Sequence, residues 1–227
     1  MADTEFDIIV YGATGYTGRL VAEYLAEEYG NTELKWAMAG RSLSKLASVR
    51  SELGISDQVT LLEVDVESPE SVSDMVDACR VVITTVGPYQ LYGDELVKQC
   101  AERGTDYVDL TGEPSWMHET IDRYGTMAKA SGARIVHSCG FDSIPSDMGV
   151  YYSQKRIFEK TGEYASMINM RVAGAKGGIS GGTYNSLSNV LEEARVDKDV
   201  RKTLTNPYGL NPVGKQFGPD KQDLQKV

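Results

Sequence analysis

Three glycines at a spacing of three follow a short β-branched run near the start of the chain. They lie in the segment Gly12-Ala13-Thr14-Gly15-Tyr16-Thr17-Gly18, and a helical pattern begins directly after it. Glycines let the backbone turn tightly and approach a pyrophosphate, and the first N–H groups of a helix attract its negative charge. Glycine triplets also occur in simple turns, but a position between a first strand and a first helix indicates a nucleotide site. The predicted cofactor-binding residues here are Gly12, Thr14, Gly15, Tyr16, Thr17 and Gly18.

Basic side chains follow the second predicted strand, where a site for NAD normally carries an acid. Arg41 lies directly after this strand, and Lys45 lies one helical turn later. A guanidinium can form two hydrogen bonds with a 2′-phosphate, and a charge-assisted bond contributes about 1.5–3 kcal/mol. The pair therefore predicts NADP rather than NAD, although two solvated surface cations would give the same pattern. Asp65, after the third strand, is predicted either to meet the adenine or to be a plain loop acid.

The fourth predicted strand ends in the segment Val86-Gly87-Pro88-Tyr89. In a doubly wound sheet this end lies beside the crevice where the strand order reverses. Gly87 permits close approach of the nicotinamide ribose, and Pro88 fixes the turn. Tyr89 and Tyr92 either face the nicotinamide or substrate, or are ordinary tyrosines at a loop edge. We therefore predict that Val86, Gly87 and Pro88 bind the cofactor, and we take Tyr89 as a catalytic candidate.

Further polar side chains follow the fifth and sixth predicted strands. Asp142 is the second catalytic candidate, since it could orient a substrate or the nicotinamide amide. The alternative is that Asp142 or Ser143 caps the helix that begins near Pro145, which is the commoner role of such residues. Cys139 is interpreted as a small buried thiol, because nothing basic is evident to activate it as a nucleophile. Three further polar residues lie at the end of the fifth strand or just after it: Asp109, Thr111 and Glu113. They either line the pocket or close a turn before Pro114.

A rival reading of the chemistry comes from spacing alone. Tyr151 and Lys155 are four residues apart, and Ser138 precedes them, as in the catalytic set of short-chain dehydrogenases. In that set the tyrosine is a general acid and the lysine lowers its pKa. The Tyr-x-x-x-Lys pattern is common by chance, and the strand at Asp106–Leu110 interrupts the expected order of elements. The short-chain interpretation therefore remains an alternative.

The elements that must position these residues alternate strictly between strand and helix over the first 137 residues. Such alternation predicts a parallel sheet with helices on both faces, a Rossmann-type α/β fold. The predicted strands are Asp7–Tyr11, Leu34–Ala39, Val59–Val64, Arg80–Val86, Asp106–Leu110 and Arg134–His137. The predicted helices follow Leu20 up to Gly30 and then span Ser44–Leu53, Pro69–Cys79, Tyr92–Arg103 and Glu119–Ser131.

The pattern changes after Pro145. We expect a helix over Ser146–Lys160, a half-exposed strand over Ser166–Val172, and a glycine-rich loop over Gly174–Gly182. A further helix carries Leu187, Val190, Leu191 and Ala194 on one face. One strand and one helix cannot bury a second core, so we expect a nucleotide-binding domain over residues 1–160 and a truncated second domain over 161–227. The alternative is a short domain that a partner subunit completes.

Composition narrows the classes of function. The chain has 227 residues, with 23 Lys and Arg against 33 Asp and Glu, a formal charge of −10. This acidic balance argues against nucleic-acid binding, and no apolar run approaches the 18 residues of a membrane span. Three cysteines and two histidines lack the spacing of a metal site, so no metal is predicted. These features are typical of a protein of the reducing cytoplasm.

Five motifs together resemble those of the saccharopine dehydrogenase-like oxidoreductases, a family that includes the mycobacterial trans-acting enoyl reductases. They are YGATGYTG from Tyr11, AGRS from Ala39, VGPYQLYG from Val86, YVDLTGE from Tyr107 and CGFDSIPSD from Cys139. The segment GGISGGT, from Gly177 to Thr183, is also similar to a glycine-rich segment of the family. The resemblance extends from about Phe6 to Thr183.

The resemblance implies a Rossmann domain followed by a second α/β domain, and an NAD(P)-dependent oxidoreductase. We therefore expect an NADPH-dependent enzyme that transfers a hydride to an enoyl or carbonyl substrate, which in some relatives is linked to a lipid. Lipid association of the whole protein and a homodimer are further expectations. No proton donor stands out, so the alternative is a sensor or scaffold that binds NADP without chemistry.

Overall fold

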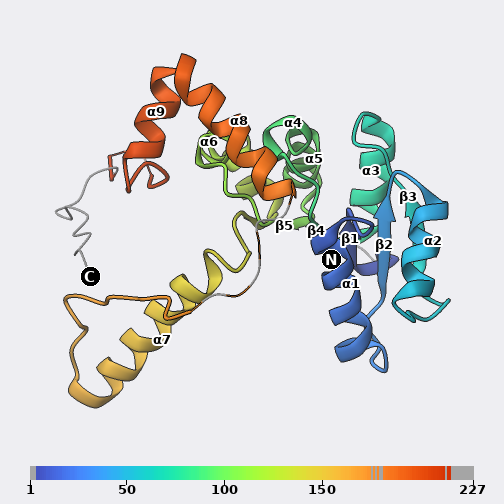
Figure 1. Ribbon diagram of the computed structural model, residues 1–227, viewed down its shortest axis with the longest axis horizontal. Helices are drawn as coiled ribbons and strands as arrows, with labels where there is room; N and C mark the ends of the chain where they lie inside the picture. Colours follow the sequence, from blue (N-terminus) through green and yellow to red (C-terminus); the bar gives the residue numbers. More distant parts are fainter. Residues whose placement is uncertain (1–3, 175, 177, 179–180, 213, 216–227) are drawn as a thin grey trace.

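The computed structural model describes residues 4–174, 176, 178, 181–212, 214 and 215 of the chain. The strands of this part form one parallel sheet in the order β3-β2-β1-β4-β5-β6 (Figure 1). The order reverses between β1 and β4, because the chain crosses from β3 on one side to β4 on the other side of β1. This arrangement confirms the predicted Rossmann-type doubly wound fold.

The strands lie close to their predicted positions. The second begins at Trp36, two residues later than predicted, because the backbone N–H of Lys35 donates to the Asp7 carboxylate at 3.0 Å. The fifth and sixth are shorter than predicted. The strands are β1 Phe6–Tyr11, β2 Trp36–Gly40, β3 Thr60–Glu63, β4 Cys79–Thr84, β5 Asp106–Val108 and β6 Ile135–Val136.

Alternate residues of each strand pack on opposite faces of the sheet, as the strand period of two requires. Ile9 and Tyr11 face a core that also contains Val72 and Val76 of α3, Leu96 of α5 and Trp116 of α6. Val10 and Met38 face a second core, with Ala22 and Leu25 of α1 and Leu46 of α2. The helices on the two faces are α1 Tyr16–Tyr29, α2 Leu43–Glu52, α3 Pro69–Asp77, α4 Tyr89–Tyr92, α5 Asp94–Arg103 and α6 Pro114–Ser131.

The helix ends follow ordinary capping chemistry. The Ser68 side chain accepts the backbone N–H of Ser71 at the start of α3. Gly104 and Gly132 end α5 and α6 in the left-handed conformation, with φ of 82° and 87°. The predicted start of α6 at Glu119 is wrong, because Pro114 already adopts the backbone angle of a first helical turn. A single helix was predicted to begin at Tyr92. The structure instead has two helices here, α4 and α5, which are divided at Gly93.

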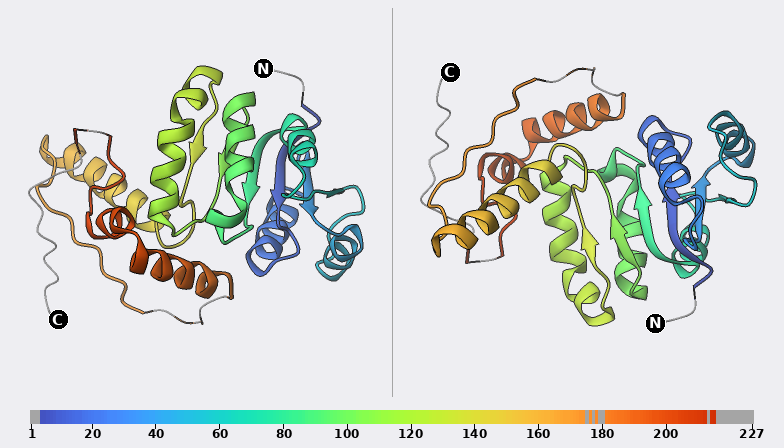
Figure 2. Two further views of the ribbon diagram at one scale, coloured as in Figure 1. Left: turned by 90° about the horizontal axis from the view of Figure 1, so that it is seen from above. Right: turned by 90° about the horizontal axis from the view of Figure 1, so that it is seen from below.

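Three helices follow the sheet: α7 Ile144–Thr161, α8 Gly181–Val196 and α9 Lys198–Thr205. Helix α7 begins before the predicted Ser146, and neither Asp142 nor Ser143 caps it through a side chain. Helix α9 is short and mostly polar, and it begins where the Asp197 carboxylate accepts the backbone N–H groups of Asp199 and Val200. In Figures 1 and 2, α7 extends away from the sheet, while α8 and α9 lie beside α6.

The predicted strand over Ser166–Val172 is wrong. This segment has no regular structure, although its side chains alternate as in a strand. A strand needs a neighbour for its backbone hydrogen bonds, and no other strand of the described part adjoins this segment. Parts of the predicted glycine-rich loop, including Gly177, lie outside the described residues.

The half of the sheet formed by β4–β6 has helices on one face, and its other face carries no helix among the described residues. The crossovers α3, α5 and α6 cover the face of β4–β6 that bears Val82 and Tyr107. The opposite face bears Ile83, Val108 and Val136, which are paired in register, and Val136 is 47% exposed. Parallel sheets are normally covered on both faces, so this side of β4–β6 is an apolar surface open to contact.

Candidate cofactor site

The glycine loop after β1 is held between the ends of two neighbouring strands. The backbone N–H of Gly12 donates to Ala39 O of β2 at 2.9 Å, and Thr85 Oγ1 after β4 donates to Gly12 O at 3.2 Å. Gly12 has φ of +90°, and a Cβ there would lie 2.8 Å from Thr85 Oγ1. The position therefore requires glycine for its conformation and for its lack of a side chain.

Gly18 is required for a different reason. It lies in the first turn of α1, and a Cβ on it would lie 2.1 Å from Gly12 O. The absence of a side chain lets the helix pack directly on the loop. Gly15 precedes α1 without a side-chain cap, so the first N–H groups of the helix are not occupied by one. This end of α1 points its free donors at the space above the loop, as an anion site requires.

A cleft of about 220 Å³ opens along the carboxyl ends of β1, β2 and β4. Its wall joins the three predicted motifs, although they are far apart in the sequence. Tyr11, Val66 and Thr85, which are not among the predicted cofactor-binding residues, also contribute to the wall. The cleft is lined by Tyr11, Gly12, Thr14, Gly15, Gly40, Arg41, Val66, Thr85, Val86, Gly87 and Tyr92.

Arg41 lies at the mouth of this cleft, directly after β2, and its side chain is exposed. Lys45 lies on α2, which Ser42 caps by accepting the Lys45 backbone N–H. Neither cation forms an ion pair with a described residue, whereas Arg19 and Arg50 both do. Arg41 lines the cleft, whereas Lys45 does not, and both are available to an anionic ligand.

Asp65 does not line the cleft. It follows β3, and its carboxylate accepts the backbone N–H of Glu67 at 3.1 Å. The next residue, Val66, forms the cleft wall instead. Burial and the Asp65 carboxylate raise the pKa of Tyr11 to about 12, with Arg41 opposing. Tyr11 and Arg41 both line the cleft.

The turn after β4 brings Val86 and Gly87 to the other end of the cleft. Pro88 is buried beneath the turn and precedes α4. Tyr89 is only 5% exposed, and its hydroxyl donates to Thr84 O at 3.3 Å. Burial raises the pKa of Tyr89 well above its usual range, and Asp109 raises it further. Tyr89 thus supports the turn from beneath, and Tyr92 is the tyrosine of this segment that reaches the cleft.

A buried carboxylate fixes the start of α4. Glu113 has no exposed surface, and its two oxygens accept the backbone N–H groups of Tyr89 at 3.1 Å and Gln90 at 2.9 Å. The carboxylate thereby satisfies donors that a short helix would leave without partners. Two alternatives were open for Asp109, Thr111 and Glu113, namely lining the pocket or closing a turn. All three are buried and hold turns, and none of them lines the cleft.

A second buried set of polar groups supports the loop after β6. The Asp109 carboxylate lies 2.6 Å from His137 Nδ1 and accepts the Tyr107 hydroxyl at 2.9 Å. Its other oxygen accepts the backbone N–H of Ser138 at 2.8 Å, and Ser138 has φ of +59°. These bonds hold Ser138 in a conformation that non-glycine residues adopt rarely.

Helix α8 contacts the cofactor turn from above. Gln90 Nε2 donates to Glu193 of α8, and a Cβ on Gly87 would lie 3.8 Å from Ser186 Oγ. Ser186, Val190 and Glu193 are spaced four and three residues apart, so they share one helix face. Val190 on that face is 7% exposed, whereas Leu187 and Leu191 are more than half exposed. The face of α8 that docks therefore shares Val190 with the predicted apolar stripe but does not include Leu187 or Leu191.

The remaining candidates lie away from the cleft. Asp142 is exposed on the turn before α7, and its carboxylate forms no hydrogen bond with a described residue. Cys139 is partly buried, and burial raises the pKa of its thiol, which opposes a role as nucleophile.

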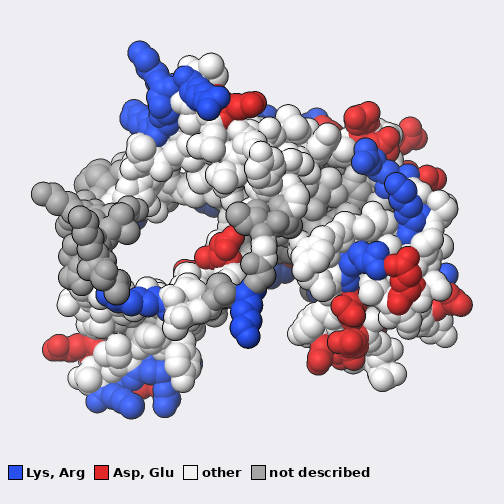
Figure 3. Space-filling model, in the orientation of Figure 1, with Lys and Arg blue, Asp and Glu red and all other residues white. Residues whose placement is uncertain are grey.

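The Ser138 hydroxyl donates to Thr111 O. Tyr151 lies on α7 and is 61% exposed. An opening separates α7 from α8 and α9 (Figure 3). The short-chain set of Ser138, Tyr151 and Lys155 is therefore not brought to the cleft.

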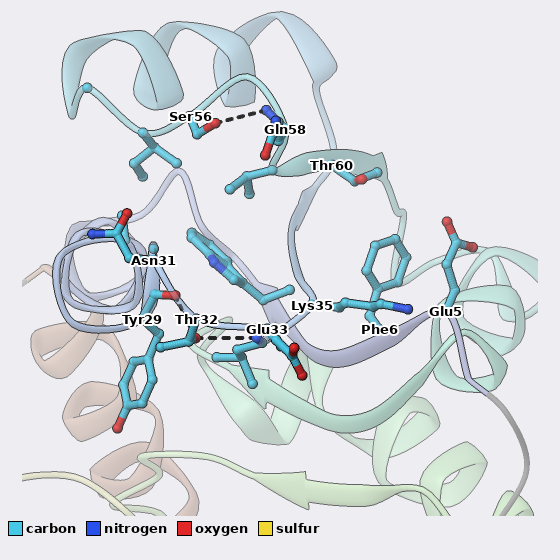
Figure 4. A pocket seen from close by; sticks show the side chains of 17 residues that line it. Glu5, Phe6, Tyr29, Asn31, Thr32, Glu33, Lys35, Ser56, Gln58 and Thr60 are labelled. Atoms are coloured by element: carbon cyan, nitrogen blue, oxygen red, sulfur yellow. Dashed lines mark hydrogen bonds between the residues drawn. The ribbon is translucent and has the colours of Figure 1, made fainter.

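A larger cavity lies at the opposite edge of the sheet. It measures about 670 Å³ and opens at the amino ends of β1, β2 and β3. Phe6, Trp36 and Lys35 line it, but the polar groups around it form local turn contacts (Figure 4). Ligands of such sheets bind at the carboxyl ends of the strands, so the smaller cleft is the candidate cofactor site.

Two classes of site are not found in the described part of the chain. It holds no group of three His, Cys, Asp or Glu that could bind a metal ion. None of its helices is long and apolar enough to cross a membrane.

Several known proteins are similar to this chain. A putative trans-acting enoyl reductase of Mycobacterium tuberculosis is 47% identical over 209 residues, which cover 92% of this chain and 49% of that protein. A trans-acting enoyl reductase of Mycobacterium bovis is 42% identical over 211 residues, or 92% and 50%. The chain thus spans about half the length of these relatives. Apo saccharopine dehydrogenase of Saccharomyces cerevisiae is 19% identical, with a TM-score of 0.48 over 68% of this chain and 31% of that chain.

The family follows from the part of the chain that contains the sheet. Residues 8–136 match the saccharopine dehydrogenase NADP binding domain, and this range runs from β1 to the end of β6. It includes the glycine loop, Arg41 and the turn after β4. The predicted resemblance and the predicted cofactor, NADP, are both confirmed at the level of the family. The chain belongs to the family of saccharopine dehydrogenase NADP-binding domains.

Proposed function

We propose that this chain forms the cofactor-binding part of an NADPH-dependent reductase acting on an enoyl or carbonyl substrate. The observation that carries the proposal is the cleft in which Gly12, Gly87 and Arg41 meet. Gly12 and Gly18 leave no room for a Cβ, as a loop against a pyrophosphate requires. Arg41 and Lys45 lie where a 2′-phosphate would need cations. The residues present therefore fit NADPH.

Each wall of the cleft has a proposed role toward the cofactor. Thr14, Gly15, Tyr16 and Thr17 hold the pyrophosphate at the start of α1. Arg41 and Lys45 hold the 2′-phosphate, and Val66, beside Asp65, flanks the adenine. Val86, Gly87 and Pro88 hold the nicotinamide end. Bound reduced nicotinamide supplies a hydride to an electrophilic carbon, and the protein contributes position and electrostatics.

The substrate class rests on the relatives rather than on this cleft. The similar mycobacterial proteins are named trans-acting enoyl reductases, so we propose an α,β-unsaturated acyl substrate, linked to a lipid in the full protein. Residues 161–227 would then begin a second, substrate-binding domain. The open apolar side of β4–β6 supports a proposed homodimer. Three free cysteines support a reducing, cytoplasmic location.

The cofactor proposal is tested by separate titrations with NADPH and NADH, following nicotinamide fluorescence at fixed salt. We expect NADPH to bind at least tenfold more tightly. Equal affinities would contradict the role of Arg41 while leaving the nucleotide site in place. Absence of binding for both would contradict the proposal as a whole.

The reductase proposal is tested by the oxidation of NADPH, measured by its absorbance, with a panel of enoyl thioesters and carbonyl compounds. Turnover with enoyl thioesters of increasing acyl length would support the proposed substrate class. The buried Tyr89 hydroxyl favours the second candidate, a protein that binds NADP without catalysis. Tight NADPH binding without any turnover would support that second candidate and contradict the first.

A further inference from the structure

Tyr89 and Tyr92 lie one helical turn apart on α4, but their hydroxyl groups have different surroundings. The Tyr89 hydroxyl is in the interior, where it contacts Thr84 O at 3.3 Å and the backbone N–H of Leu110 at 3.4 Å. Tyr92 is 38% exposed and lines the cleft with Val86 and Gly87. Its hydroxyl forms no hydrogen bond within the described part of the chain. Tyr92 is thus free to contact a molecule bound in the cleft.

The other proton-bearing side chains of the cleft are poorly suited to proton transfer at the β4 end. Thr85 Oγ1 donates to Gly12 O and is part of the loop structure. Tyr11 is 2% exposed, and burial and Asp65 raise its pKa to about 12, so it releases its proton less readily than an exposed tyrosine. Threonine and arginine side chains also hold their protons too tightly to serve as general acids near neutral pH. Tyr92 is the remaining acid of the described cleft.

We propose that Tyr92 is the proton donor of the reaction, an inference that rests on the proposed function. The β-carbon of the enoyl substrate receives the hydride of reduced nicotinamide and forms a new C–H bond. The π electron pair of the C=C bond then takes the Tyr92 hydroxyl proton at the α-carbon. One hydride and one proton are added, the cofactor is oxidised, and the phenolate regains a proton from water. The exposure of Tyr92 gives water access to its oxygen.

A binding experiment tests the position of Tyr92 without catalysis. The protein is nitrated with tetranitromethane alone, with NADP⁺, and with NADP⁺ plus a saturated acyl thioester, and modified tyrosines are mapped by mass spectrometry. We expect Tyr92 to react in the free protein and to be protected in the ternary complex. Tyr152, 64% exposed on α7, is the internal control and should react throughout. Unchanged Tyr92 nitration, with ligand binding verified by fluorescence, would contradict the proposal.

A kinetic experiment tests the chemistry. Tyr92→Phe is expected to lower kcat for enoyl reduction by at least about 100-fold, the usual minimum contribution of a general acid. Its Kd for NADPH should stay within about twofold, since the phenyl ring remains as cleft wall. The matched control is Tyr151→Phe, a tyrosine of α7 outside the cleft. Full activity of Tyr92→Phe in an assay where the wild type turns over would overturn the inference and leave the proposed function intact.

Isotope labelling separates proton donation from a structural role. In D₂O the wild type should place one deuterium on a single face of the α-carbon. The residual product of Tyr92→Phe should be a mixture of molecules with the deuterium on one or the other face of the α-carbon, because water then protonates the intermediate from either side. Retained single-face labelling in the variant would contradict donation by Tyr92. A wild type without turnover on any substrate would contradict the inference and the proposed function together.

Discussion

The carboxylate of Glu113 accepts the backbone N–H of Tyr89 at 3.1 Å, across 24 residues of sequence. Glu113 precedes α6, and Tyr89 begins α4, directly after the turn that lines the cleft. A second oxygen of the same carboxylate accepts the Gln90 N–H. One buried side chain therefore connects the loop after β5 to the turn after β4. The position of Gly87 depends on it.

We predict that Glu113→Gln destabilises the protein by about 1–3 kcal/mol, because the amide can present only one carbonyl oxygen to the two donors. NADPH affinity should fall as well, since the turn over Val86 and Gly87 loses its support. Urea unfolding and fluorescence titration measure the two effects. Glu119→Gln, an exposed change on the same helix, is the control and should stay within about 0.5 kcal/mol. Equal stability of the two variants would contradict the role of Glu113.

The second prediction concerns the choice of cofactor. Arg41→Ala should weaken NADPH binding by about 10- to 150-fold, the equivalent of 1.5–3 kcal/mol for a charge-assisted contact. NADH, which lacks the 2′-phosphate, should bind almost equally to the variant and the wild type. Lys45→Ala should show the same selectivity with a smaller loss. Arg134→Ala is the control, since this arginine pairs with Asp106 at the far edge of the sheet. Parallel losses for NADPH and NADH would contradict a contact to the 2′-phosphate.

The sequence predicted the part of the site that depends on backbone geometry. Glycine spacing, strand ends and the two cations are local features, and the parallel sheet brings them together at one edge. Tertiary contacts were not predictable in this way. Nothing local distinguishes Tyr89 from Tyr92, and tertiary contacts such as the packing of Trp116 against Tyr89 separate their roles. The burial of Glu113 similarly depends on a partner 24 residues away.

The same limit explains the error at Ser166–Val172. Alternation of apolar and polar residues predicts a strand only where a neighbouring strand is present to pair with it. The helix α9 was missed for a different reason, because it is short and mostly polar, with Val200 and Leu204 as its apolar residues. The residue patterns of single segments thus predicted the sheet better than the region after it. In the sheet, strand and helix patterns alternate repeatedly along the chain.

The third prediction compares two helical glycines. Gly18→Ala should destabilise the protein by about 1–3 kcal/mol and remove most NADPH binding, because the new Cβ would lie 2.1 Å from Gly12 O. Gly125→Ala in α6 meets no atom within 4 Å and should stabilise the helix by up to about 1 kcal/mol. Thermal unfolding and cofactor titration of both variants provide the test. A stable Gly18→Ala variant with normal binding would contradict close packing of α1 on the loop.

The fourth prediction concerns pH and the docking of α8. Burial raises the pKa of Glu193 above its ordinary value, and the neighbouring acids Glu119, Asp197 and Glu113 raise it further. The native state therefore binds this proton more tightly than the unfolded state. The resulting stability is present below the unfolded pKa, near 4.5, and is lost as pH rises through the raised folded pKa.

Glu193→Gln keeps a side-chain oxygen for the Gln90 contact but cannot ionise. We expect its unfolding midpoint to equal that of the wild type near pH 4 and to exceed it at pH 7–8. Thermal unfolding at pH steps between 4 and 8 measures the difference. Glu192→Gln, an exposed neighbour on α8, is the control. A difference that shrinks as pH rises would contradict the predicted sign.

The last prediction tests the open side of the sheet with two valines. Val82 on β4 is fully buried against α3 and α5, so Val82→Ala should cost about 2 kcal/mol for two lost methyl groups and the cavity they leave. Val136 on β6 is 47% exposed, so Val136→Ala should cost less than about 1 kcal/mol. Urea unfolding at several protein concentrations measures both. Equal costs that grow with concentration would show that the face bearing Val136 is buried between two copies of the chain, because self-association adds stability by mass action.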